Sequence, residues 1–319
     1  ALGLVLAGSG NRAFCSGGDV KALASALRGD LRSALPALQL SLEYRSIEAL
    51  HRKAGDGPTV ALVDGVCMGY GLGLATACAH RVVTERSVLA MPECAIGIVP
   101  DAGFAAVAAE LPAGLGLCMA LTGWRLSGPE ALTAGLATHF VPAEGMAELR
   151  TALSELDWQA AEVALCLGRA ASAAAPGAGP EPEPGLEEVL PLVRDVFADA
   201  PSVSAVRAGL VACIETCSCP RLLRWATDRL EGFDRGCPVA QAVSLHLLRA
   251  AELDLRAHPG LKNRHWRLVS ALERDYRAMS SLLRRPDFLE GVCAGLVDRD
   301  GSPSWSCRLQ DLKPSAVDD

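Results

Sequence analysis

Short apolar runs alternate with longer amphipathic stretches over the first half of the chain. The runs have the length of buried strands and end at glycine-rich turns, and the stretches between them repeat apolar residues every three or four positions. The runs predicted as strands are 2–7, 59–66, 81–84 and 139–141. Helices are predicted from Asp19, up to about Lys53, after the glycines at 69–73, and around Leu117 and Ala131. This alternation predicts an α/β fold with at least partly parallel strands.

The pattern changes in the second half of the chain. Apolar residues at helical spacing recur over 204–216, 220–230, 239–255 and 267–283, and we predict no strand there. The stretch 171–185 holds four prolines and three glycines and is predicted to be a linker or an inserted loop. We therefore expect an α/β core over 1–155, a linker at 171–185 and a helical region over 186–319.

Composition narrows the function classes. The 319 residues are 50% hydrophobic and 21% charged, which is typical of a globular protein and excludes disordered and collagen-like chains. The net charge of −7 argues against a surface devoted to binding phosphates. Six of the twelve cysteines, at positions 15, 67, 78, 94, 118 and 166, lie mostly in apolar runs. Cys213, Cys217 and Cys219 have no zinc-ligand spacing, so we expect neither disulfides nor a metal. The most apolar window, 59–79, is broken by Asp64 and four glycines, so no membrane span is predicted, and no signal peptide is recognised.

Two glycine-rich turns are candidates for binding an anion or a polarised carbonyl. The segment 8–13 superficially matches a dinucleotide fingerprint, but residues 14–18 delay the following helix, so nucleotide binding is not expected. Residues 16–19 instead place a tight turn directly before a helix, with Asp19 as its N-cap. Residues 68–73 open another helix after a strand. Two such turns can together form an oxyanion hole.

A third segment, 91–103, places Glu93 and Asp101 in a loop punctuated by glycine and proline. Two carboxylates in such a loop suit acid/base catalysis. The alternative is structural: Glu93 would cap a helix and Asp101 would begin a helix over 102–110.

The ordered set of these segments resembles the crotonase (enoyl-CoA hydratase/isomerase) superfamily, and its 3-hydroxyisobutyryl-CoA hydrolase branch in particular. The segments that carry the resemblance are 13–19, 60–69, 81–85, 90–97, 100–101, 121–126, 134–139, 287–292 and 296–305. They cover nearly the whole chain outside the proline-rich stretch. The resemblance implies a spiral of ββα repeats with a helical C-terminal region, and it places the family's first strand before Leu2.

The resemblance also implies a site for an acyl-CoA thioester. The backbone N–H groups of Gly18 and Tyr70 would form the oxyanion hole, with Gly17 and Gly69 beside them in contact with the substrate. No cofactor is implied other than the coenzyme A that the substrate carries.

Three carboxylates complete the implied site. Glu93 would activate water or attack the thioester, Asp101 would bind the 3-hydroxyl group, and Glu43 would be a further substrate contact.

The chain departs from the family pattern at two glycine positions. Tyr70 interrupts a glycine triplet after Met68, and Phe104 replaces a glycine after Gly103. Each change adds a ring where the family pattern keeps the backbone bare.

Two hypotheses follow from these observations. The first is an active acyl-CoA thioester hydrolase of the mitochondrial matrix, acting in valine catabolism, with hydratase or isomerase activity as a less favoured variant. The second is a pseudoenzyme: a structural subunit of the small subunit of the mitochondrial ribosome, with ribosomal proteins and rRNA as partners. The changes at Tyr70 and Phe104 favour it, and 26 Arg against 4 Lys suit phosphate contacts.

Overall fold

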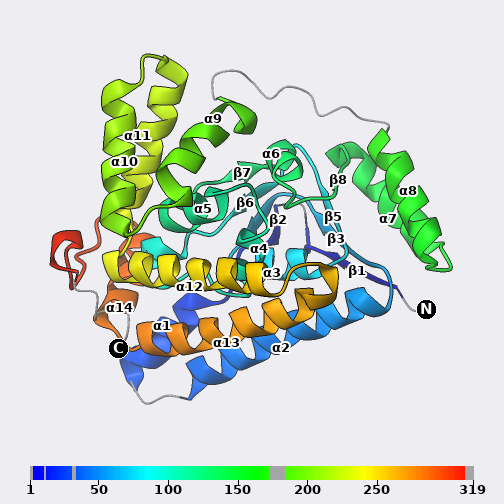
Figure 1. Cartoon of the computed structure of the whole chain (residues 1–319). Coiled ribbons are helices and arrows are strands. Elements are labelled where there is room, and N and C mark those ends of the chain that lie inside the picture. The colour runs from blue at the N-terminus through cyan, green and yellow to red at the C-terminus, as the bar shows by residue number, and fades with distance from the viewer. Residues whose placement is uncertain (1–2, 11, 31–33, 173–183, 313–319) are drawn as a thin grey trace. The chain divides into compact units, whose positions relative to one another are not determined.

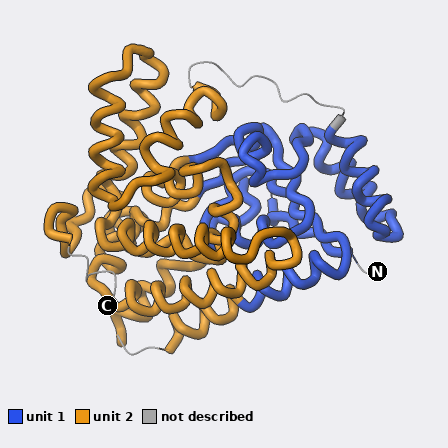
Figure 2. The backbone as a smooth tube through the Cα atoms, in the orientation of Figure 1, with its two compact units in different colours: residues 1–17, 45–90, 125–181 blue, residues 18–44, 91–124, 182–319 orange. Residues whose placement is uncertain are grey.

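The chain forms two compact units, each assembled from separate stretches of sequence (Figure 2). The computed structural model describes residues 3–10, 12–30, 34–172 and 184–312. Unit 1 comprises residues 1–17, 45–90 and 125–181, and unit 2 comprises 18–44, 91–124 and 182–319. Most of the predicted linker at 171–185 lies outside the described residues. The predicted division into 1–155 and 186–319 stays a prediction.

Unit 1 contains two four-stranded sheets. The first sheet has the order β1-β3-β5-β8, with every pair parallel. Its strands are β1 (Leu4–Ala7), β3 (Thr59–Val63), β5 (His80–Val83) and β8 (His139–Phe140). The second has the order β2-β4-β6-β7, and only its last pair is antiparallel. Its strands are β2 (Ala13–Cys15), β4 (Val66–Met68), β6 (Val88–Ala90) and β7 (Leu126–Ser127). The predicted α/β fold is confirmed.

The single strand predicted over 59–66 is wrong, because the chain changes sheets within it. Strand β3 ends at Val63 and β4 begins at Val66. Between them Gly65 has a φ of +82°, and a Cβ added to it would lie 2.3 Å from the carbonyl oxygen of Arg12. Only glycine combines this backbone conformation with so close an approach. This turn creates the paired strands of one ββα repeat.

Two helices, α7 (Met146–Ser154) and α8 (Ala160–Ser172), cover one face of the first sheet. Val60, Leu62 and Val82 of the sheet are buried against Leu149 and Leu153 of α7 and against two apolar residues of α8, Val163 and Leu167. Unit 1 also contains α3 (Tyr70–Ala77), α6 (Gly128–Thr133) and the second half of α2 (Leu35–Asp56).

Unit 2 is helical, and its described residues contain no strand. Besides the first half of α2, its helices are α1 (Val20–Gly29), α4 (Phe104–Ala108), α5 (Leu115–Thr122), α9 (Leu186–Val193), α10 (Val203–Thr216), α11 (Pro220–Arg235), α12 (Pro238–Ala257), α13 (Arg264–Leu282) and α14 (Pro286–Val292) (Figure 1). Every residue of α5 is buried, and α5 packs against α9, α11 and α12. The four helical segments predicted beyond residue 200 are confirmed.

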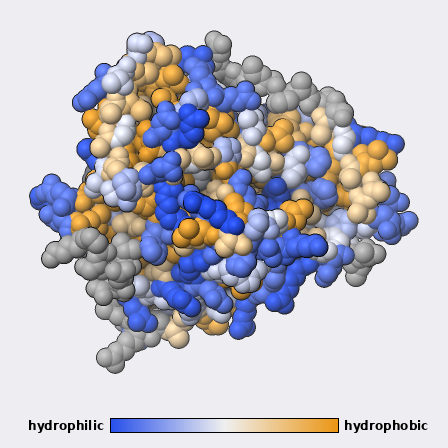
Figure 3. Space-filling view, viewed as in Figure 1, coloured by the Kyte–Doolittle hydropathy of each residue, from blue (hydrophilic) through white to orange (hydrophobic). Residues whose placement is uncertain are grey.

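Hydrophilic residues are interspersed with hydrophobic ones on the face shown in Figure 3. Among the exposed large apolar side chains, Leu35, Leu38 and Leu42 recur at helical spacing on α2. None of the described helices combines the length and apolar character that crossing a bilayer requires.

Candidate active site

The first glycine turn lies against the start of α3 within unit 1. Gly17 has a φ of +110°, and a Cβ added to it would lie 3.6 Å from the carbonyl oxygen of Met68. A Cβ on Gly71 would lie only 2.3 Å from the carbonyl oxygen of Cys15. The glycine at 71 therefore allows α3 to pack directly on the end of β2.

Tyr70 begins α3, and its ring is tied to α2. Gly69 is the N-cap, with a φ of +55°, and its N–H donates to the carbonyl oxygen of Ala90. The Tyr70 side chain is half-buried, and its hydroxyl lies 2.6 Å from the hydroxyl of Ser46. This hydrogen bond fixes the ring that replaces the glycine of the family pattern.

Gly18 and Glu43 meet in unit 2. Asp19 is the N-cap of α1 as predicted, and its carboxylate accepts a hydrogen bond of 2.9 Å from the N–H of Ala22. A Cβ on Gly18 would lie 2.9 Å from Oε1 of Glu43, so these two predicted site residues are neighbours. Burial raises the pKa of Glu43, and a hydrogen bond from Gln39 partly offsets the effect.

The predicted oxyanion pair joins residues of different units. Tyr70 belongs to unit 1 and Gly18 to unit 2. The pairing of their N–H groups around one oxygen therefore stays a prediction.

Glu93 is a buried carboxylic acid with an unsatisfied oxygen. It is the first residue of a short 3₁₀ turn, Glu93–Ile96, whose N-cap is Pro92, so the structural alternative in which Glu93 caps a helix is wrong. Only 7% of Glu93 is exposed, and its Oε2 has no hydrogen-bond partner among the described residues. Burial and the charge of Asp101 raise the pKa of Glu93 well above its usual value.

Asp101 is equally buried, but its carboxyl group is held. Its Oδ2 accepts a hydrogen bond of 2.7 Å from the hydroxyl of Tyr44. Burial raises the pKa of Asp101 to about 7, the Tyr44 hydrogen bond lowers it, and the charge of Glu43 raises it. The predicted helix start at Asp101 is wrong: α4 begins at Phe104 with Gly103 as its N-cap.

Asp275 of α13 supports the same loop from within the protein. It is completely buried, and its Oδ2 accepts a hydrogen bond of 2.8 Å from the N–H of Gly103. Its Oδ1 has no partner among the described residues. Burial and the charge of Asp101 raise the pKa of Asp275 well above its usual value.

Sequence reasoning missed both Tyr44 and Asp275. A signal for Asp275 existed, because it stands in register with Leu268, Leu272 and Met279 on the buried side of α13. An acid on an apolar helix face is a reason to look for a polar partner.

Phe104 takes part in the core of unit 2. Only 2% of its surface is exposed, and its helix α4 packs against α5, α12 and α13. The ring that replaces a family glycine therefore fills space between helices.

Two carboxyl groups with different surroundings are the chemical core of this site. Asp101 is hydrogen-bonded, whereas Glu93 has an unsatisfied oxygen, and the charge of Asp101 makes ionisation of Glu93 harder. Carboxyl groups in such different surroundings can take different roles in one reaction.

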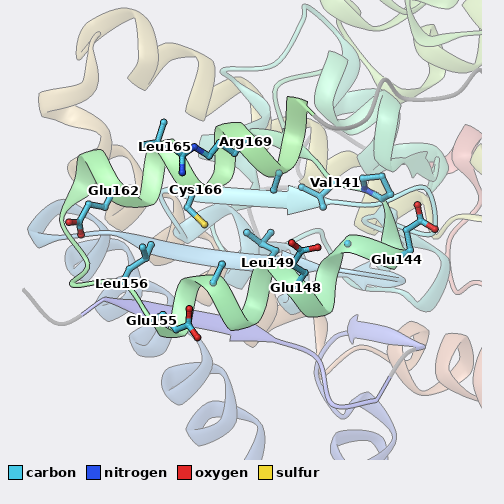
Figure 4. Close-up of a pocket in the computed structure, with 14 residues that line it drawn as sticks. Val141, Glu144, Glu148, Leu149, Glu155, Leu156, Glu162, Leu165, Cys166 and Arg169 are labelled. Atoms are coloured by element: carbon cyan, nitrogen blue, oxygen red, sulfur yellow. The ribbon is translucent and has the colours of Figure 1, made fainter.

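A cavity of about 730 Å³ lies in unit 1 between α7 and α8 (Figure 4). Its apolar lining includes Leu149 and Leu165, and its charged lining residues are Glu144, Glu148, Glu155, Glu162 and Arg169. This acidic excess repels the phosphate groups of coenzyme A, and none of the predicted site residues lines the cavity. The cavity therefore does not fit as the acyl-CoA site.

Metal ligation finds no support in the side chains that the structure describes. Within those ranges no three His, Cys, Asp or Glu residues are grouped so that they could hold a metal ion. All twelve cysteines are free thiols.

Comparison with known proteins identifies the family. The profile of the enoyl-CoA hydratase/isomerase family matches residues 2–319. A mitochondrial 3-hydroxyisobutyryl-CoA hydrolase of Gallus gallus is 32% identical over 317 residues, which are 99% of this chain and 75% of the relative. The 3-hydroxyisobutyryl-CoA hydrolase 1 of Arabidopsis thaliana is 31% identical, and the match spans 99% of this chain and 78% of the relative.

Solved structures agree with these sequence relatives. An enoyl-CoA hydratase from Rhodobacter sphaeroides 2.4.1 is 31% identical, with a TM-score of 0.77 over 99% of this chain and 82% of that protein. A carnitinyl-CoA dehydratase from Mycobacterium thermoresistibile is 28% identical, with a TM-score of 0.80 over the same shares. The resemblance read from the sequence motifs is confirmed: the chain belongs to the enoyl-CoA hydratase/isomerase family of the crotonase superfamily.

Proposed function

We propose that this protein hydrolyses an acyl-CoA thioester. The observation that carries the proposal is the buried Glu93 carboxyl, whose Oε2 has no partner among the described residues, beside an Asp101 that Tyr44 holds. A buried polar atom without a partner is costly, and a substrate or a water molecule would satisfy it. The relatives named as 3-hydroxyisobutyryl-CoA hydrolases support 3-hydroxyisobutyryl-CoA as the substrate.

The proposed reaction assigns one role to each group. Glu93 takes a proton from water, or attacks the acyl carbon itself, and the thioester carbonyl oxygen becomes an oxyanion stabilised by the N–H groups of Gly18 and Tyr70. When water attacks, the C–S bond breaks, the acyl group leaves as a carboxylic acid and the sulfur of coenzyme A takes up the proton that Glu93 holds. When Glu93 attacks, breakage of the C–S bond frees the thiolate and leaves an anhydride on Glu93. Water then hydrolyses this anhydride, which releases the carboxylic acid, restores Glu93 and supplies the proton for the sulfur. Asp101 binds the 3-hydroxyl group. Loss of one oxyanion donor typically costs about 2.7–4 kcal/mol of barrier.

The proposed compartment is the mitochondrial matrix, with valine breakdown as the proposed pathway. Support comes from relatives whose names include the word mitochondrial. The free thiols are consistent with a reducing compartment.

A non-catalytic role is the second candidate, and the two aromatic replacements favour it. Phe104 is buried in the core and Tyr70 is bonded to Ser46, so both rings are integrated into the protein. A structural subunit of the mitochondrial ribosome is the form of this role that the family resemblance offers.

Hydrolysis of 3-hydroxyisobutyryl-CoA, followed as free coenzyme A by chromatography, distinguishes the two. We expect turnover of about 1–10³ s⁻¹ in the wild type. The isosteric Glu93→Gln variant should abolish it, whereas the exposed Glu273→Gln variant of the same unit should not. An inactive wild type that gains activity in Tyr70→Gly would contradict the proposal and favour the non-catalytic role.

A further inference from the structure

The loop from Asp101 to Gly103 is held at both ends by side chains distant in sequence. Tyr44, 57 positions before Asp101, donates its hydroxyl to the Asp101 carboxyl. Asp275, 172 positions after Gly103, accepts the Gly103 N–H. All of these residues belong to unit 2.

The backbone between these two contacts is strained. Ala102 has a φ of +58° and Gly103 a φ of +77°, so two successive residues adopt the left-handed conformation. An alanine adopts it only where the surrounding structure determines it. The same turn directs the Asp101 carboxyl, so the restraints that maintain it also fix the position of that acid.

We propose that Tyr44 and Asp275 are positioning residues for Asp101: Tyr44 fixes Oδ2 of its carboxyl group, and Asp275 fixes the loop that carries it. The catalytic consequence rests on the proposed hydrolase function. The contacts themselves do not, and they can be tested in a protein that hydrolyses nothing.

Packing alone does not account for these two residues. Tyr44 is 6% exposed and Asp275 is fully buried. Phenylalanine at position 44 and leucine at position 275 would fill comparable space without burying polar atoms. A hydroxyl and a carboxyl that hydrogen-bond the two ends of one loop orient that loop. Groups that hydrogen-bond metal ligands and catalytic acids from behind orient those residues in the same way.

The Tyr44 hydrogen bond determines which oxygen of Asp101 carries its proton when the carboxyl group is neutral. Because the hydroxyl donates to Oδ2, the proton of a neutral Asp101 resides on Oδ1. The other ionisable side chains that face this carboxyl are Glu43, Glu93 and Asp275, and each is an acid. Tyr44 is therefore the group among them that favours ionised Asp101, and its loss raises the pKa of Asp101 above about 7.

The first test uses the whole protein and needs no substrate. The chain has three tyrosines, Tyr44, Tyr70 and Tyr276, so labelling the phenol carbons with ¹³C gives three NMR signals, assignable with Tyr→Phe variants. We expect the Tyr44 signal to shift with a midpoint at about pH 7, and the shift to vanish in Asp101→Asn. A Tyr44 signal that is independent of pH, or that titrates unchanged in Asp101→Asn, would overturn the proposal.

The second test is kinetic. We expect Tyr44→Phe to lower kcat by about tenfold to a hundredfold with little change in KM, because a hydrogen bond to an ionised group is lost. The pH–rate limb that belongs to Asp101 should move to higher pH. The control is Tyr276→Phe, the same change at a more exposed tyrosine of the same unit. An unmoved limb in Tyr44→Phe would refute its positioning role even if kcat fell.

The third test separates the hydrogen-bond acceptor that Asp275 provides from the volume that its side chain fills. Asparagine keeps an oxygen acceptor for the Gly103 N–H, whereas leucine keeps only the volume. We expect Asp275→Asn to retain most of the activity and Asp275→Leu to lose it. Equal losses in two folded variants, or full activity in Asp275→Leu, would show that the acceptor does not position the loop.

Discussion

Replacing Asp101 with asparagine should change how the stability of the protein depends on pH. Burial raises the pKa of Asp101 from 3.8 to about 7, so the folded protein binds this proton more tightly than the unfolded chain does. Stability from this group is therefore fully present at acidic pH and is lost as the pH rises from about 4 to above 7. The whole difference corresponds to about 4 kcal/mol, because one pKa unit is worth about 1.4 kcal/mol. About 2.5 kcal/mol of it falls between pH 5 and pH 8.

The assay is urea unfolding at pH 5 and pH 8, followed by tryptophan fluorescence under reducing conditions. Relative to Asp101→Asn, the wild type should lose about 2.5 kcal/mol of unfolding free energy between these two pH values. Removal of the Asp101 charge also lowers the pKa of Glu93 and Asp275, which adds to the difference in the same direction. The exposed Asp298→Asn variant should follow the wild type. If wild type and Asp101→Asn shift in parallel, the Asp101 carboxyl is not the buried acid described above.

Two further predictions concern the glycine turns. Gly103→Ala should destabilise the protein by about 2–4 kcal/mol in denaturant unfolding, because the left-handed φ of +77° disfavours alanine and the new Cβ would lie 2.4 Å from Leu268 Cδ1. The control is Gly55→Ala, whose new Cβ would meet nothing within 4 Å and should not destabilise the protein. Equal effects of the two substitutions would refute the argument. Tyr70→Phe and Ser46→Ala should each lower the free energy of unfolding by about 0.5–1 kcal/mol. The two losses should be non-additive in a double-mutant cycle, because both substitutions remove the same hydrogen bond. Additive losses would mean that this hydrogen bond contributes nothing.

The sequence predicted those parts of the fold that have long patterns. Strands such as β1 and β3 and the helices beyond residue 200 each extend over enough residues for a period to appear. The strands of the second sheet contain two or three residues each, which is too few to show alternation. The break at Gly65 was missed for the same reason.

The candidate site divides in a similar way. The sequence motifs singled out Gly18, Glu93 and Asp101, and the family resemblance added Glu43. The structure places these four residues within unit 2. The sequence analysis did not find Tyr44, because no local pattern reports a contact between a helix and a loop 57 positions away.

The interleaving of the two units has a consequence for synthesis on the ribosome. Helix α5 ends at Thr122. Its partner α4 precedes it, but its partners α9, α11 and α12 all follow residue 185. At about 5–20 residues per second, the last stretch of unit 2, residues 182–319, takes roughly 7–30 s to translate. During that time an eight-residue segment that is wholly buried in the finished protein has no complete core to enter. The last described helix of unit 1, α8, is translated before residues 182–319 of unit 2. Unit 1 of a nascent chain should therefore fold before unit 2, and α5 should be the segment most in need of a chaperone.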